Sequence, residues 1–250
     1  MRQPAFLAVL LLVLPGFRQA DDWEKREQKD AKGAKLSYRL FKPKAAAGKE
    51  KLPLVLFLHG AGERGEDNEA QLKHAVKYFV AAQTQFPCYI AAPQCPAKAQ
   101  WVDTPWGNPK HTMPAQPSDP MRLALEMIAA LEKEFPIDSK RLYVTGLSMG
   151  GFGTWDVIQR NPKKWAAAVP VCGGADDALA PVIAKIPVWV FHGGNDDVVK
   201  TARSRNITEA LKKAGGSPKY TEYPGVGHGC WDQAYQEKEL LPWLFAQKLP

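Results

Sequence analysis

The motif Gly-Leu-Ser-Met-Gly-Gly at residues 146–151 constrains the fold more than any other part of the sequence. It lies between an apolar, strand-like run over residues 141–145 and a helix-like stretch that opens at the last glycine of the motif. A sharp turn from strand to helix crowds its neighbours, so Gly146 and Gly150 must lack side chains. The pattern predicts a strand, a tight turn and a helix, with Ser148 raised at the turn.

Short, continuously apolar runs recur along the chain and predict strands that are covered on both faces. These runs cover residues 54–58, 89–92, 142–145, 167–171 and 188–191. A probable edge strand at residues 35–42 precedes them, and a strand-like segment at 220–223 follows. Uniformly apolar strands are typical of a parallel sheet with helices on both sides.

Helical segments alternate with these strands. Ser118 opens a segment with apolar side chains at helical spacing, and residues 201–214 end at two glycines, as a helix does at its carboxyl end. The alternation predicts an α/β fold with a doubly wound, mostly parallel sheet. Ligands of such sheets bind beyond the carboxyl ends of the strands, where Ser148 is expected.

The amino terminus has the pattern of a secretory signal peptide. Residues 5–14 are apolar, follow Arg2 and precede a potential cleavage site after Ala20, although Arg18 leaves an uncleaved anchor as an alternative. We therefore expect a signal peptide at residues 1–20, a single catalytic domain at 21–250, a secreted or periplasmic location, and no stable membrane span after cleavage. The net charge of +7 comes from scattered lysines, which does not favour nucleic-acid binding.

A serine nucleophile needs a histidine base that is oriented by a carboxylate. Two histidines follow Ser148, and His192 sits at a strand end directly before the candidate acid loop, whereas His228 lies in a glycine-rich loop. We therefore predict His228 as the base. One carboxylate of the pair Asp196 and Asp197 is expected to orient the histidine and the other to cap the turn or face water, and Asp196 is preferred as the acid. Asp176 and Asp177, in the loop that follows residues 171–174, are outside candidates.

Stabilising the oxyanion of an acyl-transfer intermediate requires two backbone N–H donors. Met149, directly after the nucleophile, supplies one of them. The other is expected from Ala61, or alternatively Gly62, in a glycine-containing loop that follows an early strand. His59 in the same loop is interpreted as a structural residue.

The long segment between Pro93 and Pro120 contains seven of the 21 prolines and shows little periodicity. Trp101, Trp106 and Trp231 are candidates for an aromatic wall of the substrate pocket, and simple packing under a long loop is an equal alternative.

The sequence predicts no cofactor and no metal site. The four cysteines show neither a C-x-x-C pair nor a clustering with histidine that would indicate a metal. In an exported chain they allow three disulfide pairings, and free buried thiols are an equal alternative. The cysteines are Cys88, Cys95, Cys172 and Cys230.

With these residues placed, the chain resembles the α/β-hydrolase superfamily. The likeness is to secreted bacterial serine hydrolases of the phospholipase/carboxylesterase, dienelactone-hydrolase-like, polyhydroxybutyrate-depolymerase-like and prolyl-oligopeptidase-like groups. It rests on residues 58–68, 143–156, 192–199 and 225–228. Dienelactone hydrolases proper carry a cysteine nucleophile where this chain has Ser148.

The residues and the resemblance together predict a serine esterase that cleaves small-molecule or polymeric carboxylic esters through an acyl-enzyme. Ser148 attacks, His228 moves the proton and Asp196 orients His228. A prolyl-oligopeptidase-like peptidase is the alternative with the same catalytic parts. A non-catalytic binding module is a further alternative, whose usual mark is the loss of one of these three residues.

Overall fold

An eight-stranded sheet forms the centre of the protein. The structure is a computed structural model that describes residues 23–48 and 50–250, so the expected signal peptide lies outside the described residues. The strands are β1 (Trp23–Lys29), β2 (Lys35–Phe41), β3 (Leu52–Leu58), β4 (Tyr89–Pro93), β5 (Ile137–Leu147), β6 (Ala167–Val171), β7 (Trp189–Gly193) and β8 (Lys219–Tyr223).

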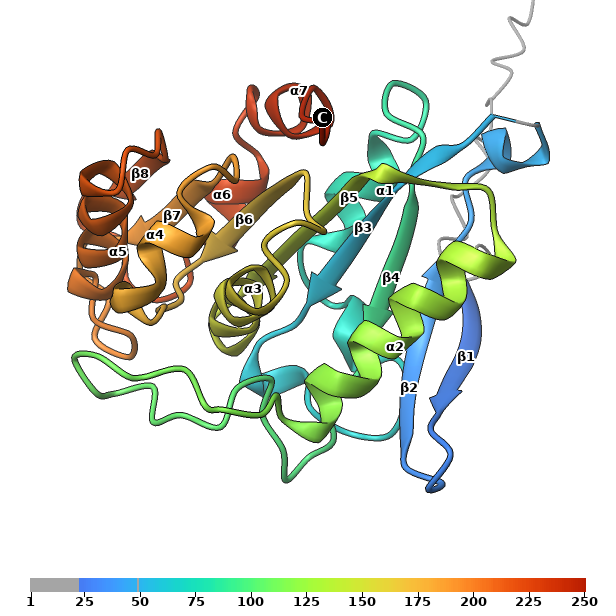
Figure 1. The fold of residues 1–250 in the computed structure, drawn as a ribbon, viewed down its shortest axis with the longest axis horizontal. Coiled ribbons are helices and arrows are strands. Elements are labelled where there is room, and N and C mark those ends of the chain that lie inside the picture. The colour runs from blue at the N-terminus through green and yellow to red at the C-terminus, as the bar shows by residue number, and fades with distance from the viewer. Residues whose placement is uncertain (1–22, 49) are drawn as a thin grey trace, which may run out of the picture.

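The strand order is β1-β2-β4-β3-β5-β6-β7-β8. Strand β2 is antiparallel to both of its neighbours, and β3 to β8 are parallel, so their arrowheads point to one edge in Figure 1. The predicted doubly wound, mostly parallel α/β fold is therefore confirmed. The loops that follow β3, β5, β7 and β8 meet at the carboxyl edge, where the chain brings its candidate site residues.

Helices cover both faces of the sheet (Figure 1). They are α1 (Val76–Ala81), α2 (Asp119–Glu134), α3 (Met149–Arg160), α4 (Ala180–Ile183), α5 (Ala202–Lys213), α6 (Trp231–Tyr235) and α7 (Leu240–Phe245). Short 3-10 turns are η1 (Lys44–Ala47), η2 (Ala61–Glu63), η3 (Ala70–Leu72) and η4 (Asp177–Leu179). Among the described residues, no helix is long and apolar enough to cross a membrane.

Alternation along the central strands divides the core into two layers. In β3, Leu54 and Leu56 belong to the buried cluster that includes residues of α2, α3, α4 and α5, whereas Val55 and Phe57 belong to the cluster that includes residues of α1, α6 and α7. Successive side chains of a strand point to opposite faces, so a strand between two helix layers must be apolar at every position. This requirement explains the uninterrupted apolar runs of the sequence.

Strand β1 and the start of helix α3 are among the differences from the sequence-based expectation. Strand β1 was not predicted because its sequence, Trp-Glu-Lys-Arg-Glu-Gln-Lys, is mostly polar; it forms the sheet edge and pairs only with β2. Helix α3 begins at Met149, two residues before the expected start, because the turn at Ser148 is tighter than the spacing alone indicates.

Candidate active site

The turn between β5 and α3 holds Ser148 in a strained conformation. Its φ of 54° and ψ of −117° lie where residues other than glycine are uncommon, and its N–H donates to the carbonyl of Val171 over 2.9 Å. A Cβ on Gly150 would stand 1.8 Å from the carbonyl oxygen of Leu58, and one on Gly146 would stand 2.4 Å from that of Gly150. The two glycines therefore allow α3 to pack directly against the end of β3.

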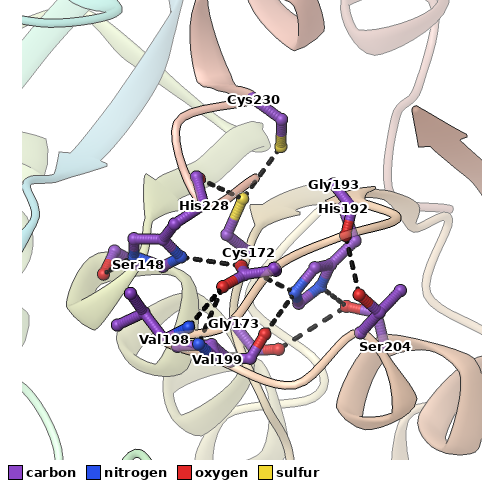
Figure 2. A network of polar contacts seen from close by, with 12 residues as sticks. Ser148, Cys172, Gly173, His192, Gly193, Val198, Val199, Ser204, His228 and Cys230 are labelled. Carbon is purple, nitrogen blue, oxygen red and sulfur yellow. Dashed lines mark hydrogen bonds and ion pairs between the residues drawn. The ribbon is translucent and has the colours of Figure 1, made fainter. Parts of the chain in front are cut away.

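Ser148, His228 and Asp196 form a continuous chain of hydrogen bonds, of which Figure 2 labels Ser148 and His228. The Ser148 Oγ lies 2.8 Å from His228 Nε2, and His228 Nδ1 lies 2.7 Å from Asp196 Oδ2. Because a carboxylate only accepts, Nδ1 carries the proton and Nε2 is free to accept from the serine hydroxyl. The structure thus brings together three residues that the sequence places 80 and 32 positions apart.

The Asp196 carboxylate is buried and receives several donors. Its Oδ1 accepts from the N–H groups of Val198 and Val199, each over 2.9 Å, and its Oδ2 accepts from His228 and lies 3.1 Å from His192 Nε2. Desolvation opposes ionisation, yet the hydrogen bonds from His192, His228 and Val199 hold the pKa of Asp196 well below its usual range. The carboxylate therefore stays ionised beside the imidazole.

His192 supports this carboxylate, a role that the sequence reasoning missed. Its side chain is fully buried, with Nε2 2.9 Å from the carbonyl of Val199 and Nδ1 2.7 Å from Ser204 Oγ. Since Nε2 faces two oxygen acceptors it carries the proton, and Nδ1 accepts from the serine. The His-Gly-Gly-Asn-Asp spacing at residues 192–196 is the signal that was available in the sequence.

The alternative acids occupy other positions. Asp197 is exposed, whereas Asp196 is buried. Asp176 accepts from the N–H groups of Met113 and Ala178 over 2.9 Å and 3.1 Å, which makes it a loop-fixing residue. The geometry accordingly favours Asp196 as the partner of His228.

Two candidate oxyanion donors stand at helix starts. Met149 is the first residue of α3 and Ala61 is the first residue of η2, so helix geometry leaves each N–H without an acceptor inside its own helix. Both elements follow central strands at the same edge of the sheet. The amino end of α3 also carries partial positive charge, which favours a developing anion.

His59, directly after β3, is a buried, neutral and structural residue. Its Nδ1 lies 2.6 Å from the carbonyl of Gly60, and its Nε2 accepts from the N–H of Cys95 over 2.9 Å. Burial lowers the pKa of His59 to about 4. The imidazole thus links the loop after β3 to the end of β4.

The structure corrects the aromatic wall predicted from sequence. Trp101 is fully buried, and its Nε1 donates to the carbonyl of His59 over 3.0 Å, so it belongs to the core and offers no surface to a substrate. Trp106 is partly buried against the same core, with Arg64 over its ring. Trp231 alone among the three packs on the catalytic candidates, its ring edge-on to His228 with centroids 5.7 Å apart.

Arginine side chains fasten the proline-rich connection between β4 and α2. The buried Arg203 of α5 donates to the carbonyls of Asn108 and Ala175 and contacts His111 Nδ1. Arg160 of α3 donates to the carbonyl of Pro114 over 2.6 Å. A segment without helix or strand is thereby held by side chains from two helices.

Cys172 and Cys230 lie next to the segment that carries His228. All four cysteines are buried with free thiols, and the sulfurs of Cys172 and Cys230 are 2.8 Å apart. Cys172, Asp196 and His228 are also close enough together to share a metal ion. A metal there would replace the contact between Asp196 and His228, so these three residues fit the hydrogen-bonded chain better than a metal centre.

A family model matches residues 112–239, described as the dienelactone hydrolase family. The match covers more than half of the chain and includes Ser148, Asp196 and His228. The chain belongs to the dienelactone hydrolase family. This family membership agrees with the resemblance of the sequence motifs to the α/β-hydrolase superfamily.

Several known proteins are similar to this chain over most of its length. A probable carboxylesterase of Oryza sativa subsp. japonica is 26% identical over 202 residues, 74% of this chain and 75% of that protein. An uncharacterized secreted protein of Arthroderma benhamiae is 28% identical over 235 residues, 78% of this chain. The crystal structure of a thermostable esterase superposes with a TM-score of 0.85 and 40% identity over 91% of this chain. This chain spans 24% of the Arthroderma protein and 64% of the esterase.

Proposed function

We propose that this protein is a carboxylic ester hydrolase that works through an acyl-enzyme on Ser148. The observation that carries the proposal is the hydrogen-bonded chain from Ser148 through His228 to Asp196, with the serine raised on a strained turn. Relatives named as carboxylesterases and the likeness to a thermostable esterase support the same activity.

In the acylation step, Ser148 Oγ bonds to the ester carbonyl carbon while its proton passes to His228 Nε2. The carbonyl oxygen becomes an oxyanion, which the N–H groups of Met149 and Ala61 stabilise. Collapse of this intermediate breaks the bond to the alcohol oxygen, which leaves with the proton from His228. Asp196 keeps the imidazole in the required tautomer and stabilises its charged form.

In the deacylation step, water attacks the acyl carbon and gives its proton to His228. The bond to Ser148 Oγ then breaks, the proton returns to the serine and the carboxylic acid departs. Ser148, His228 and Asp196 end in the protonation states in which they began, so the cycle consumes no cofactor.

The test is hydrolysis of p-nitrophenyl esters from acetate to palmitate by residues 21–250 and by Ser148→Ala. We expect turnover by the parent protein and its loss in the variant. An aminoacyl-proline p-nitroanilide, a chromogenic amide, is included. Faster cleavage of this amide than of any ester would favour a peptidase, and a folded parent protein with no more turnover than Ser148→Ala would favour a binding module.

We further propose export of the chain, with a signal peptide at residues 1–20 and one catalytic domain at 21–250. The apolar run behind Arg2 supports export, and a relative is described as a secreted protein. Expression of the full chain in a bacterium followed by mass analysis of the periplasmic and medium fractions tests this. A product that retains residues 1–20 would contradict it.

A further inference from the structure

The thiols of Cys172 and Cys230 meet behind the candidate catalytic residues (Figure 2). Cys172 directly follows β6, and Cys230 closes the His228 loop at the start of α6. Their sulfurs are 2.8 Å apart although the residues are 58 positions apart in sequence, and both side chains are fully buried. An S–S bond of about 2.05 Å would require the sulfurs to approach by less than about 1 Å.

The backbone at Cys172 indicates that its side chain is needed there. Its φ of 49° lies in the left-handed region, where glycine is the usual residue. The next two residues, Gly173 and Gly174, are glycines, yet the strained position carries a sulfur. That sulfur donates to the carbonyl of His228 over 3.1 Å, so it already contacts the segment that carries the candidate base. A residue that keeps a strained backbone conformation where glycine would be unstrained points to a use for its side chain.

We propose that Cys172 and Cys230 are a covalent modification site and form a disulfide when the chain folds in an oxidising compartment. The bond would fix the segment of His228 to the end of β6. Val171, directly before Cys172, accepts a hydrogen bond from the N–H of Ser148. The disulfide would therefore connect the segment that carries His228 to the strand end that positions Ser148. This proposal rests on export but not on the proposed ester hydrolysis.

The oxidant is a disulfide of a small thiol or of a thiol–disulfide oxidoreductase. The thiolate of one cysteine attacks this disulfide, forms a mixed disulfide and releases one thiol. The thiolate of the other cysteine then attacks the protein sulfur of the mixed disulfide and releases the second thiol. Two protein thiols lose two protons and two electrons, and the oxidant disulfide becomes two thiols.

Sheet geometry excludes disulfides that involve Cys88 or Cys95. Cys88 and Cys95 flank β4, and five strand residues at about 3.3 Å each hold their Cα atoms far beyond the 7 Å limit of a disulfide. Cys95 follows β4, which is three strands from β6, so about 14 Å separates it from Cys172. Cys88 lies at the opposite, amino edge of the sheet. The single bond between Cys172 and Cys230 is therefore the one disulfide that the geometry allows, and Cys88 and Cys95 stay as thiols.

Burial determines when the bond forms. Desolvation raises the pKa of the Cys172 thiol, so little of the reactive thiolate exists in the folded protein. The bond is therefore expected to form during folding, and a reductant added to the native protein is expected to leave it intact.

The first test maps the cysteines of protein refolded from guanidinium with oxidised and reduced glutathione. The refolded protein is denatured without reductant, alkylated with N-ethylmaleimide and digested. We expect Cys88 and Cys95 to be alkylated and a peptide pair that joins Cys172 to Cys230. Four alkylated cysteines, glutathione adducts in place of the pair, or a linkage that includes Cys88 or Cys95 would overturn the proposal.

The second test compares the Tm of this oxidised protein with that of protein refolded under dithiothreitol. Closing a loop of 58 residues should raise the Tm of the oxidised form by about 5–10 °C. Cys88→Ala serves as the matched control and should keep the difference, whereas Cys230→Ala should lose it. Equal Tm values for the two wild-type forms would contradict a stabilising cross-link. If Cys230→Ala does not fold, the wild-type map and Tm pair decide, and neither uses ester hydrolysis.

Discussion

At the scale of single residues, two histidines share one buried carboxylate. His228 is partly exposed and faces the serine, while His192 is buried and faces Ser204. Their common partner Asp196 is ionised across the neutral range because hydrogen bonds lower its pKa. A group with a lowered pKa contributes stability above its ordinary pKa near 4, and this contribution is lost only as the pH falls below that value.

Replacing Asp196 by asparagine tests its role in orienting His228. The amide would leave the imidazole in the wrong tautomer, so kcat for an ester should fall by about 10⁴-fold, as in other serine triads. Asp197→Asn is the matched control, because the Asp197 side chain is exposed, and it should stay within a few-fold of the parent. Steady-state kinetics measure both, and equal losses in the two variants would contradict the assignment.

Motif and chain order pointed to Ser148, Asp196 and His228, and the structure joins these three residues by hydrogen bonds. The supporting role of His192 was missed, because the His-Gly-Gly-Asn-Asp spacing indicates it only together with the turn that folds residues 196–199 back onto the imidazole. Trp101 was misplaced for a related reason. A tryptophan in a proline-rich segment has the same composition whether it lines a pocket or fills the core, and only packing distinguishes the two.

At the scale of elements, the contact between the end of β3 and the start of α3 requires glycine. Gly150→Ala would place a methyl group against the Leu58 carbonyl, so we expect a loss of about 3 kcal/mol or more in unfolding free energy. Gly107→Ala is the control, since no atom lies within 4 Å of its added Cβ and its φ is not positive. Urea unfolding compares them, and a stable Gly150→Ala would contradict this close contact.

The connection of residues 94–118 depends on its arginine anchors. Arg203→Met would remove donors to the carbonyls of Asn108 and Ala175, so we expect faster proteolysis within this connection and about 2–4 kcal/mol less stability. Arg205→Met on the same helix is the control, because Arg205 is exposed and solvent screens its ion pair with Glu222. Limited proteolysis with mass mapping gives the result; similar cleavage in both variants would count against the anchor.

Strands were predictable from the sequence where burial requires an uninterrupted run of apolar residues. Strands β3, β4 and β6 are covered on both faces, so their sequences are apolar throughout. Strand β1 has solvent on one side and a mostly polar sequence, so no apolar run marks it. The first residues of β5, Ile-Asp-Ser-Lys-Arg, were missed for the same reason.

At the scale of the whole molecule, buried neutral histidines make stability depend on pH. The pKa of His59 is about 4 in the folded protein because of burial, against about 6.5 when unfolded. The unfolded chain therefore binds this proton first as the pH falls, and stability declines between about pH 6.5 and 4 by up to ~1.4 kcal/mol per pH unit. Burial lowers the pKa of His111 to about 4 as well, with the same sign.

Urea unfolding at pH 7, 6 and 5 measures this dependence. His59→Gln lacks the titrating imidazole, so its stability should fall less steeply with decreasing pH, although it starts from a lower value. A slope equal to that of the parent protein would show that His59 does not titrate as described.

Covalent capture shows whether Ser148 is an activated nucleophile. A fluorophosphonate ester is incubated with the parent protein, Ser148→Ala and His228→Ala, and intact mass and peptide maps are recorded. We expect one adduct per chain at Ser148, none in Ser148→Ala and much slower labelling of His228→Ala. A folded, ester-hydrolysing protein that remains unlabelled at Ser148, or is labelled at another residue, would contradict the assignment of Ser148 as the nucleophile.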